Sequence, residues 1–227
     1  KATSSADWSA RKNFNTVVYD NKIWILGGET ASGTSNDVWY STDGSNWTEA
    51  TSSADWPARR NFSAVVFDNK MWVMGGGGSA TNGVTSFKDV WYSTDGVNWT
   101  QATSNVVFKG RAHMAITTFD NKMWVVGGWG GGCTNTNCHD VWYSTDGSNW
   151  TKATSDNKIV GNSQDQSVAS TSSKIFIFGG IYSHSNLSWY SSDGITWSNI
   201  IFPSTGSSKG ALQNAGFYIA ADSNNVI

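Results

Sequence analysis

An internal repeat constrains this chain more than any other feature, because repeats of about 20 to 50 residues mark solenoids, propellers or arrays. The segment Asp20-Asn-Lys-Ile-Trp-Ile-Leu-Gly-Gly28 recurs at Asp68 to Gly76, at Asp120 to Gly128 and, more loosely, at Ser172 to Gly180. A second block ends in tryptophan each time, at Asp37 to Trp47, Asp89 to Trp99, Asp140 to Trp150 and Ser188 to Trp197. Four full units are therefore present.

A weaker fifth unit occupies the C-terminal residues. Its Phe217-Tyr-Ile matches Ile23-Trp-Ile, and its Ser223 to Ile227 resembles Ser35 to Trp39. The N-terminal Lys1-Ala-Thr-Ser4 matches Lys152 to Ser155, the segment after the last tryptophan of the third unit. We therefore expect the N-terminal residues to supply the strand that the fifth unit lacks.

Each unit predicts four short antiparallel strands. In the second unit they are expected at Arg59 to Phe67, Lys70 to Gly75, Asp89 to Ser93 and Asn98 to Thr103, where β-branched and aromatic residues are bounded by turn signals. No stretch of about 11 residues has sustained helical periodicity. One such unit cannot bury its own faces, so the expected fold is an all-β propeller of four-stranded antiparallel blades.

The units divide residues 1–227 into blades of a single expected domain. They cover approximately 8–53, 56–104, 108–154, 160–202, and 207–227 together with 1–6. The prediction is five blades, the last one closed by the N-terminal strand, because closure removes exposed sheet edges. The alternative is a fragment of a six- or seven-bladed ring.

The repeat resembles known families. The double glycine after an apolar strand, the later tryptophan, and Arg11, Arg59 and Arg111, each 13 residues before the tryptophan of that strand, resemble kelch repeats. In the fourth unit the arginine position holds Ser163. The Ser-Thr-Asp-Gly-x-x-Trp hairpins also resemble the Asp-box turn of sialidase-type propellers. The resemblance implies a propeller but no single activity, because kelch propellers include oxidases, isomerases and binding modules.

Composition and residue supply exclude several classes of function. The 15 Lys and Arg against 17 Asp and Glu leave no basic face for nucleic acid. Apolar runs such as Ile23 to Leu26 hold four residues, so membrane insertion is not expected. Most Asp and Glu residues lie at repeat positions, where folding explains them. Few are left to form the pair of catalytic carboxylates that a glycoside hydrolase needs, so such an enzyme is disfavoured. No metal or cofactor is expected, because His113, His139 and His184 lie in different units without ligand spacing.

The expected site lies on one edge of the blades. The connections between first and second strands and between third and fourth strands are short and nearly constant, so we name that side the constant edge. The connections between second and third strands, and between successive units, lie on the other side, the variable edge. This variable edge carries all the predicted ligand-binding residues: Trp129, Arg11, Arg59, Arg111, Trp8, Trp56, His113, His139, Tyr182 and His184.

The alternatives at these residues stay open. Trp129 is the only tryptophan of 14 outside the repeat register, and it either stacks on a ligand or folds over the blade. The arginines either grip carboxylates of a ligand or bond neighbouring blades. Cys133 and Cys138 are expected to form a local disulfide, which persists only in an oxidising compartment.

The leading hypothesis is an extracellular or cell-surface module, free of catalytic residues, that binds a glycan or an acidic peptide on the variable edge. The first alternative is an enzyme resembling kelch-type sugar isomerases, with His113 as its candidate residue. The second is a structural module that contacts neighbouring domains or assembly partners.

Overall fold

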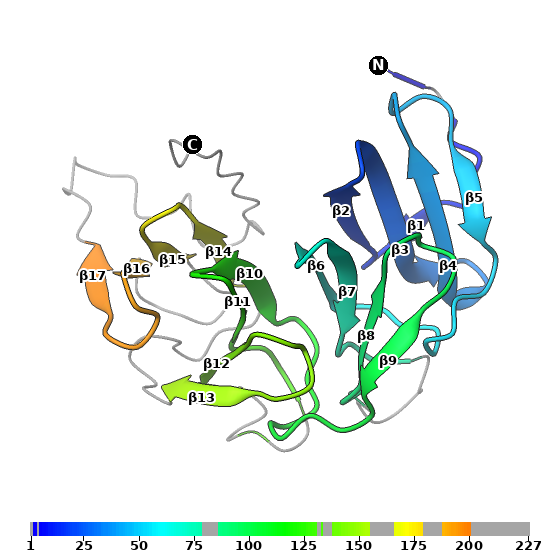
Figure 1. Ribbon diagram of the computed structural model, residues 1–227. Helices are drawn as coiled ribbons and strands as arrows, with labels where there is room; N and C mark the ends of the chain where they lie inside the picture. Colours follow the sequence, from blue (N-terminus) through cyan, green and yellow to red (C-terminus); the bar gives the residue numbers. More distant parts are fainter. Residues whose placement is uncertain are drawn as a thin grey trace, which may run out of the picture. The chain divides into compact units, whose positions relative to one another are not determined.

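The computed structural model describes residues 2–3, 5–78, 86–130, 133, 138–154, 166–178 and 188–200. No helix occurs among these residues, which form 17 strands in four antiparallel sheets (Figure 1). The all-β fold and its propeller-type blades are confirmed. The fifth unit at 207–227 lies outside the described residues, so the number of blades stays a prediction. The described part also contains no helix of the length and hydropathy that crossing a membrane requires.

The strands of the first two sheets follow the repeat. The first sheet contains β1 (Arg11–Lys12), β2 (Asn15–Tyr19), β3 (Lys22–Thr30), β4 (Gly33–Ser41) and β5 (Thr48–Thr51). The second contains β6 (Ser63–Phe67), β7 (Lys70–Met74), β8 (Val90–Ser93) and β9 (Thr100–Thr103). In each sheet the long strands pair in chain order, as a blade requires.

The last two sheets repeat this order. The third contains β10 (Ala115–Phe119), β11 (Lys122–Val126), β12 (Val141–Ser144) and β13 (Thr151–Thr154). The fourth contains β14 (Ser167–Ser170), β15 (Ile175–Phe178), β16 (Ser188–Ser191) and β17 (Ser198–Ile200). The chain divides at residues 112 and 113 into two compact units, and each unit contains two sheets.

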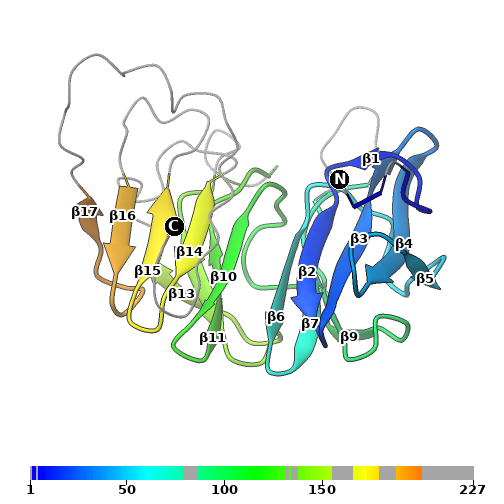
Figure 2. The ribbon, with the colours of Figure 1, turned by 90° about the horizontal axis from the view of Figure 1, so that it is seen from above.

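In the first unit, the first two sheets pack face to face. Val17, Trp24 and Leu26 of the first sheet form one core with Met71 and Val73 of the second. Strands β2 and β6 lie side by side (Figure 2), where Tyr19 Oη donates to Asn69 O at 2.9 Å. This packing buries the apolar faces that a lone blade would leave in water.

In the second unit, the third and fourth sheets pack in the same way. Trp124 and Val126 contribute to a core with Ile175 and Ile177. Ser170 Oγ donates to Thr118 O at 2.6 Å across this contact. The repeat therefore encodes one blade-to-blade contact that is used in both units.

Two sequence expectations need correction. The first strand of the second sheet begins at Ser63 and not at Arg59, because Asn61 has a positive φ of 53°, which breaks the strand. The connection between the second and third strands of the first unit, residues 29–36, does not differ from the strands as a variable loop would: it is a hairpin in which β3 and β4 continue to the pair Thr30 and Gly33. Gly33 accepts a φ of 120°, which lets the chain reverse within two residues.

Candidate binding edge of the blades

The constant edge is built of turns whose charges pair within the turn. Asp20, Asn21 and their counterparts in the second and third sheets have positive φ values between 48° and 54°, which the tight hairpins require. The lysine that follows pairs with the aspartate in each case, at 2.8 Å for Lys22 and Asp20 and at 2.7 Å for Lys70 and Asp68. These pairs recur with the repeat and leave little net charge at the turn.

The Asp-Gly hairpins complete the constant edge. In the second sheet Asp95 Oδ1 accepts hydrogen bonds from the backbone N–H groups of Val97 and Asn98, both at 2.8 Å, and Ser93 Oγ donates to it at 3.0 Å. Burial raises the pKa of Asp95, but these bonds outweigh it and hold the pKa at about 2. Asp193 has the same bonds and a pKa of about 2. The Asp-box resemblance thus corresponds to a structural turn.

The arginines of the first two repeats bind aspartates of their own blades. Arg11 Nη1 and Nη2 donate to the two carboxylate oxygens of Asp37, both at 2.7 Å. Arg59 does the same with Asp89, at 2.9 and 2.7 Å, and its side chain is completely buried. Each arginine also donates to the carbonyl of the first repeat glycine, Gly27 O at 2.9 Å or Gly75 O at 3.0 Å. The guanidinium groups of Arg11 and Arg59 are therefore already paired with carboxylates of the protein itself.

The environment of Asp37 shows how the pair is held ionised. Burial opposes the charged form, but hydrogen bonds from Arg11, Ser35 and Trp39 lower the pKa of Asp37 below its usual value. The Trp39 indole N–H contributes a bond of 2.8 Å, and Trp91 donates to Asp89 at the same distance. The tryptophan two residues after each aspartate is thus part of the site.

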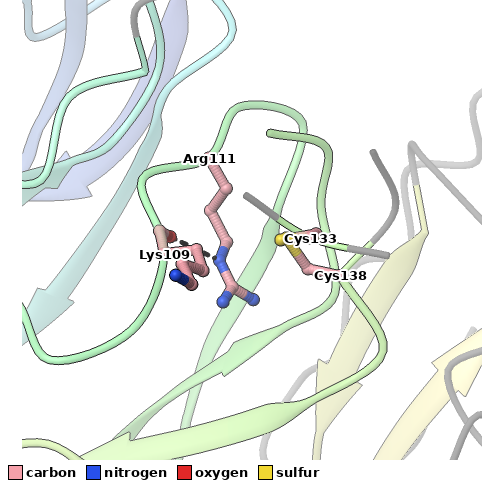
Figure 3. Close-up of a disulfide and its surroundings, with 4 residues drawn as sticks. All are labelled: Lys109, Arg111, Cys133 and Cys138. Carbon is pink, nitrogen blue, oxygen red and sulfur yellow. Dashed lines mark hydrogen bonds between the residues drawn. A yellow bond between two sulfur atoms is a disulfide. The ribbon is translucent and has the colours of Figure 1, made fainter. Parts of the chain in front are cut away.

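Arg111 holds the same repeat position and is also fully buried. Its Nε donates to Lys109 O at 3.0 Å (Figure 3), as Arg59 Nε donates to Pro57 O at 3.1 Å. Asp140 stands at the repeat position of Asp37 and Asp89. In the fourth unit the arginine position holds Ser163 and the aspartate position holds Leu187, so both partners are missing together.

The tryptophans of the variable edge differ in burial. Trp56 is completely buried and meets Trp99 edge to face at a centroid distance of 5.8 Å. Packing therefore accounts for Trp56, and a ligand could reach its ring only if the core opened. Trp8 and Trp129 are half-buried, so ligand contact through these two rings stays a prediction.

The histidine candidates also differ in whether the fold alone explains them. His113 has a φ of 54° and stands two residues after Arg111, as Asn13 and Asn61 stand two residues after their arginines with φ values of 57° and 53°. This left-handed position favours Asn and His, so a backbone turn accounts for the residue. His139 is half-buried, and Tyr182 and His184 lie outside the described residues.

The two cysteines are bonded to each other, as the sequence predicts (Figure 3). Their Cα atoms are 4.9 Å apart, within the normal range for a disulfide. Within the described residues, no group of three or more His, Cys, Asp or Glu could hold a metal ion.

The structure adds a charged cluster on the variable edge that the sequence analysis missed. Glu29 Oε2 accepts from Arg60 Nη1 at 2.8 Å and lies 3.8 Å from Lys12 Nζ. The Arg60 hydrogen bond lowers the pKa of Glu29. The Lys12 side chain is 73% exposed and that of Arg60 is 34% exposed, so two cations share one acid on an open surface. Glu29 is one of the few acids outside the repeat register, and that was the available signal.

Comparison with known proteins agrees with this geometry. A family model described as the KLHDC2/KLHL20/DRC7 kelch-repeats domain matches residues 2–128. The chain belongs to the kelch-repeat family. A kelch motif model matches residues 110–157 as well, which covers the third sheet. No curated protein matches the chain. Kelch repeats generally mediate protein–protein binding, so the class of function is binding of protein partners.

Proposed function

We propose that this kelch protein binds an acidic segment of a partner protein on its variable edge. The observation that carries the proposal is the contrast between the two edges of the first two blades. On the constant edge each lysine has its own aspartate within the turn. On the variable edge Lys12 and Arg60 share Glu29, which leaves an excess of positive charge.

The chemistry of these side chains suits a carboxylate ligand. The exposed Lys12 and the Arg60 side chain, which is 34% exposed, can donate charge-assisted hydrogen bonds to carboxylate oxygens. The buried arginines are poorer candidates, because a ligand would have to displace Asp37 or Asp89 from bidentate pairs. The half-buried Trp8 is the candidate aromatic contact on the variable edge of the first unit. Trp129 is the corresponding candidate in the second unit.

We propose further that the protein works outside the cell or on its surface. The disulfide between Cys133 and Cys138 supports this, because such bonds persist mainly in oxidising compartments. The glycan hypothesis has less support than the peptide hypothesis, since the matched family is one of protein binders.

The test compares matched charge changes on the two edges. The probe is a fluorescein-labelled peptide of alternating Glu and Gly, titrated with the full chain and followed by fluorescence anisotropy. The double variant Lys12→Gln with Arg60→Gln is expected to weaken binding by about tenfold, or about 1.4 kcal/mol. The control, Lys22→Gln with Lys70→Gln, makes the same change in net charge on the constant edge and should change the affinity by less than about twofold.

Two results would contradict the proposal. One is equal loss of affinity in both double variants, which would indicate general charge attraction. The other is failure of the chain to prefer the acidic peptide over a Ser-Gly peptide, with binding to a glycan array instead. Thermal unfolding of each variant shows whether the fold is intact.

A further inference from the structure

The residue directly after the double glycine occupies the same repeat position in three blades. It is Glu29 in the first sheet, Gly77 in the second and Trp129 in the third. In the first sheet this residue belongs to β3, and its carboxylate accepts the hydrogen bond from Arg60 in the charged cluster of the variable edge. Trp129 is half-buried. Whatever fixes the backbone at this position therefore decides how an aromatic ring is presented on the variable edge of the third sheet.

In the first two sheets, main-chain pairing fixes this position. Glu29 pairs with Thr34 in the ladder between β3 and β4. Gly77 forms antiparallel bridges with Arg60 on one side and Ser86 on the other. In both blades the residue is therefore held by the chain that leads back to the next strand.

In the third sheet, two cysteines bind the backbone on both sides of Trp129. The Cys138 N–H donates to Gly128 O at 2.9 Å, and the Cys133 N–H donates to Gly130 O at 3.2 Å. The disulfide joins these two donors, with their Cα atoms 4.9 Å apart. The carbonyl groups of both neighbours of Trp129 are thus bound to one covalently linked pair of residues.

The glycines around Trp129 would not fix the backbone by themselves. Gly127 and Gly128 precede it, with φ values of 59° and 105°, and the sequence continues with glycine at 130–132. Glycine has the greatest backbone freedom of all residues, and a single hydrogen bond to such a segment is weak because water competes for both groups. A disulfide keeps its two Cα atoms within about 4 to 7 Å of each other, so the two hydrogen bonds from the cysteines support one another.

We propose that Cys133 and Cys138 are positioning residues for Trp129, and that the oxidation state of the pair decides whether this ring is held in one orientation on the variable edge. In the oxidised protein the disulfide keeps both hydrogen bonds to the neighbours of Trp129 together. In the reduced protein each cysteine moves independently, and the ring is released. The aromatic contact of the second unit is therefore ordered in an oxidising compartment and lost in a reducing one.

The switch requires a dithiol as the external reductant. A thiolate of the dithiol attacks the Cys133 sulfur, because Cys133 is half-buried whereas Cys138 is only 2% exposed. The S–S bond breaks, and the Cys138 sulfur leaves as a thiolate and takes up a proton. The second thiol of the reductant then displaces the Cys133 sulfur, which also takes up a proton, and the reductant becomes a disulfide. The cysteines thus gain two electrons and two protons from one dithiol.

Fluorine NMR of the full chain labelled with 5-fluorotryptophan tests the proposal directly. The Trp129 signal is identified among those of the 14 tryptophans by its loss in Trp129→Phe. Treatment with dithiothreitol, a dithiol, should narrow the Trp129 signal about twofold, because a side chain that is not held reorients within nanoseconds. The signal of Trp124, a buried core residue of the same sheet, should keep its width.

Two modifications of the reduced protein separate the covalent link from the sulfur atoms. Diiodomethane joins the two sulfurs through one carbon atom and should restore the broad Trp129 signal. Methyl methanethiosulfonate caps each sulfur separately and should leave the signal narrow. The double variant Cys133→Ser with Cys138→Ser should match the capped protein, both with and without dithiothreitol.

Every other result overturns the proposal. A Trp129 signal that keeps its width after reduction, or stays narrow once the sulfurs are rejoined, would show that the cysteine pair does not position the ring. A change at Trp124 as large as the change at Trp129 would show that the bond supports the whole sheet. The acidic-peptide experiment has a separate outcome, because it uses no reductant and changes only residues of the first unit.

Discussion

Among single residues, the arginine–aspartate pairs depend most strictly on both partners being present. The pairs are Arg11 with Asp37, 26 positions apart, and Arg59 with Asp89, 30 positions apart. The Arg59 side chain is fully buried, and burial lowers the pKa of its guanidinium while Asp89 opposes that effect. A buried charge is tolerated only when its partner is present. The fourth unit shows the alternative solution, since Ser163 and Leu187 replace both charges together.

Removal of one partner of the pair should therefore lower the free energy of unfolding more than removal of both. Asp89→Leu alone is expected to lower the free energy of unfolding by about 3 to 5 kcal/mol, because it leaves the Arg59 charge buried. Adding Arg59→Ser, which reproduces the residues of the fourth unit, should recover about 2 kcal/mol of this loss. Urea denaturation of the three proteins measures both values. A double variant less stable than the single one would contradict this argument, because it would show that Arg59 stabilises the fold through its other contacts, such as the bonds to Pro57 O and Gly75 O, even without Asp89.

At the scale of the element, the Asp-Gly hairpin combines a turn, a set of hydrogen bonds and a blade contact. Gly96 has a φ of 75° and approaches Trp24 of the neighbouring blade too closely for any side chain. The aspartate before it organises the backbone N–H groups of the next residues. One four-residue motif therefore sets both the local turn and the spacing between blades.

The close approach at Gly96 predicts a coupling with Trp24. Gly96→Ala should lower the free energy of unfolding by about 1 kcal/mol through backbone strain and by about 1 to 3 kcal/mol more through the clash with the indole. The second part should disappear in a Trp24→Phe background, because the smaller ring lacks the atoms that the new methyl group would meet. A double-mutant cycle in urea measures the coupling, and additive effects would contradict the packing argument.

The low pKa values of the hairpin aspartates predict acid sensitivity. For Asp95 and Asp193 the folded-state pKa is about 2, below the reference value of 3.8. The ionised forms therefore stabilise the fold above about pH 4, and this stability is lost as the pH falls toward 2. The urea midpoint should be nearly constant from pH 5 to 7 and fall steeply below about pH 4. Asp95→Asn should lower the midpoint at neutral pH and make the acid decline shallower; an unchanged slope would contradict the assignment.

In the molecule as a whole, the four described sheets have the same strand order but differ in the connections at one edge. The constant edge of the first three blades repeats the same ion pairs, whereas the variable edge differs between repeats: it carries the Glu29 cluster in the first unit and the disulfide in the second. Binding residues commonly lie in variable connections that a rigid scaffold holds in place, and this is why we propose the variable edge as the binding surface.

The disulfide gives a prediction for the protein as purified from an oxidising compartment. Its intact mass should correspond to the chain less two hydrogen atoms, with no cysteine available to iodoacetamide before reduction. After reduction both cysteines should react. Two reactive thiols in the untreated protein would contradict both the bond and the proposed extracellular location.

Local sequence signals were sufficient to predict the plan of each blade. Repeat period, strand order, hairpin turns and the cysteine pair were all predicted, because each depends on local signals: alternation of apolar residues, positive φ at Asn, Asp and Gly, and a short loop between cysteines. The buried positions of Trp24, Trp72 and Trp124 also followed from their register.

Which of these residues contact one another depends on how the sheets pack in the folded chain. Arg59 and Asp89 lie 30 positions apart, and Glu29 and Arg60 lie 31 apart in different blades. A local pattern contains no information on such pairs until strand register and blade packing bring them together. The same applies to His113, a predicted ligand-binding residue, whose place in a left-handed turn became clear only beside Asn13 and Asn61. Contacts between distant segments depend on the packing of sheets, and this packing is a property of the folded chain.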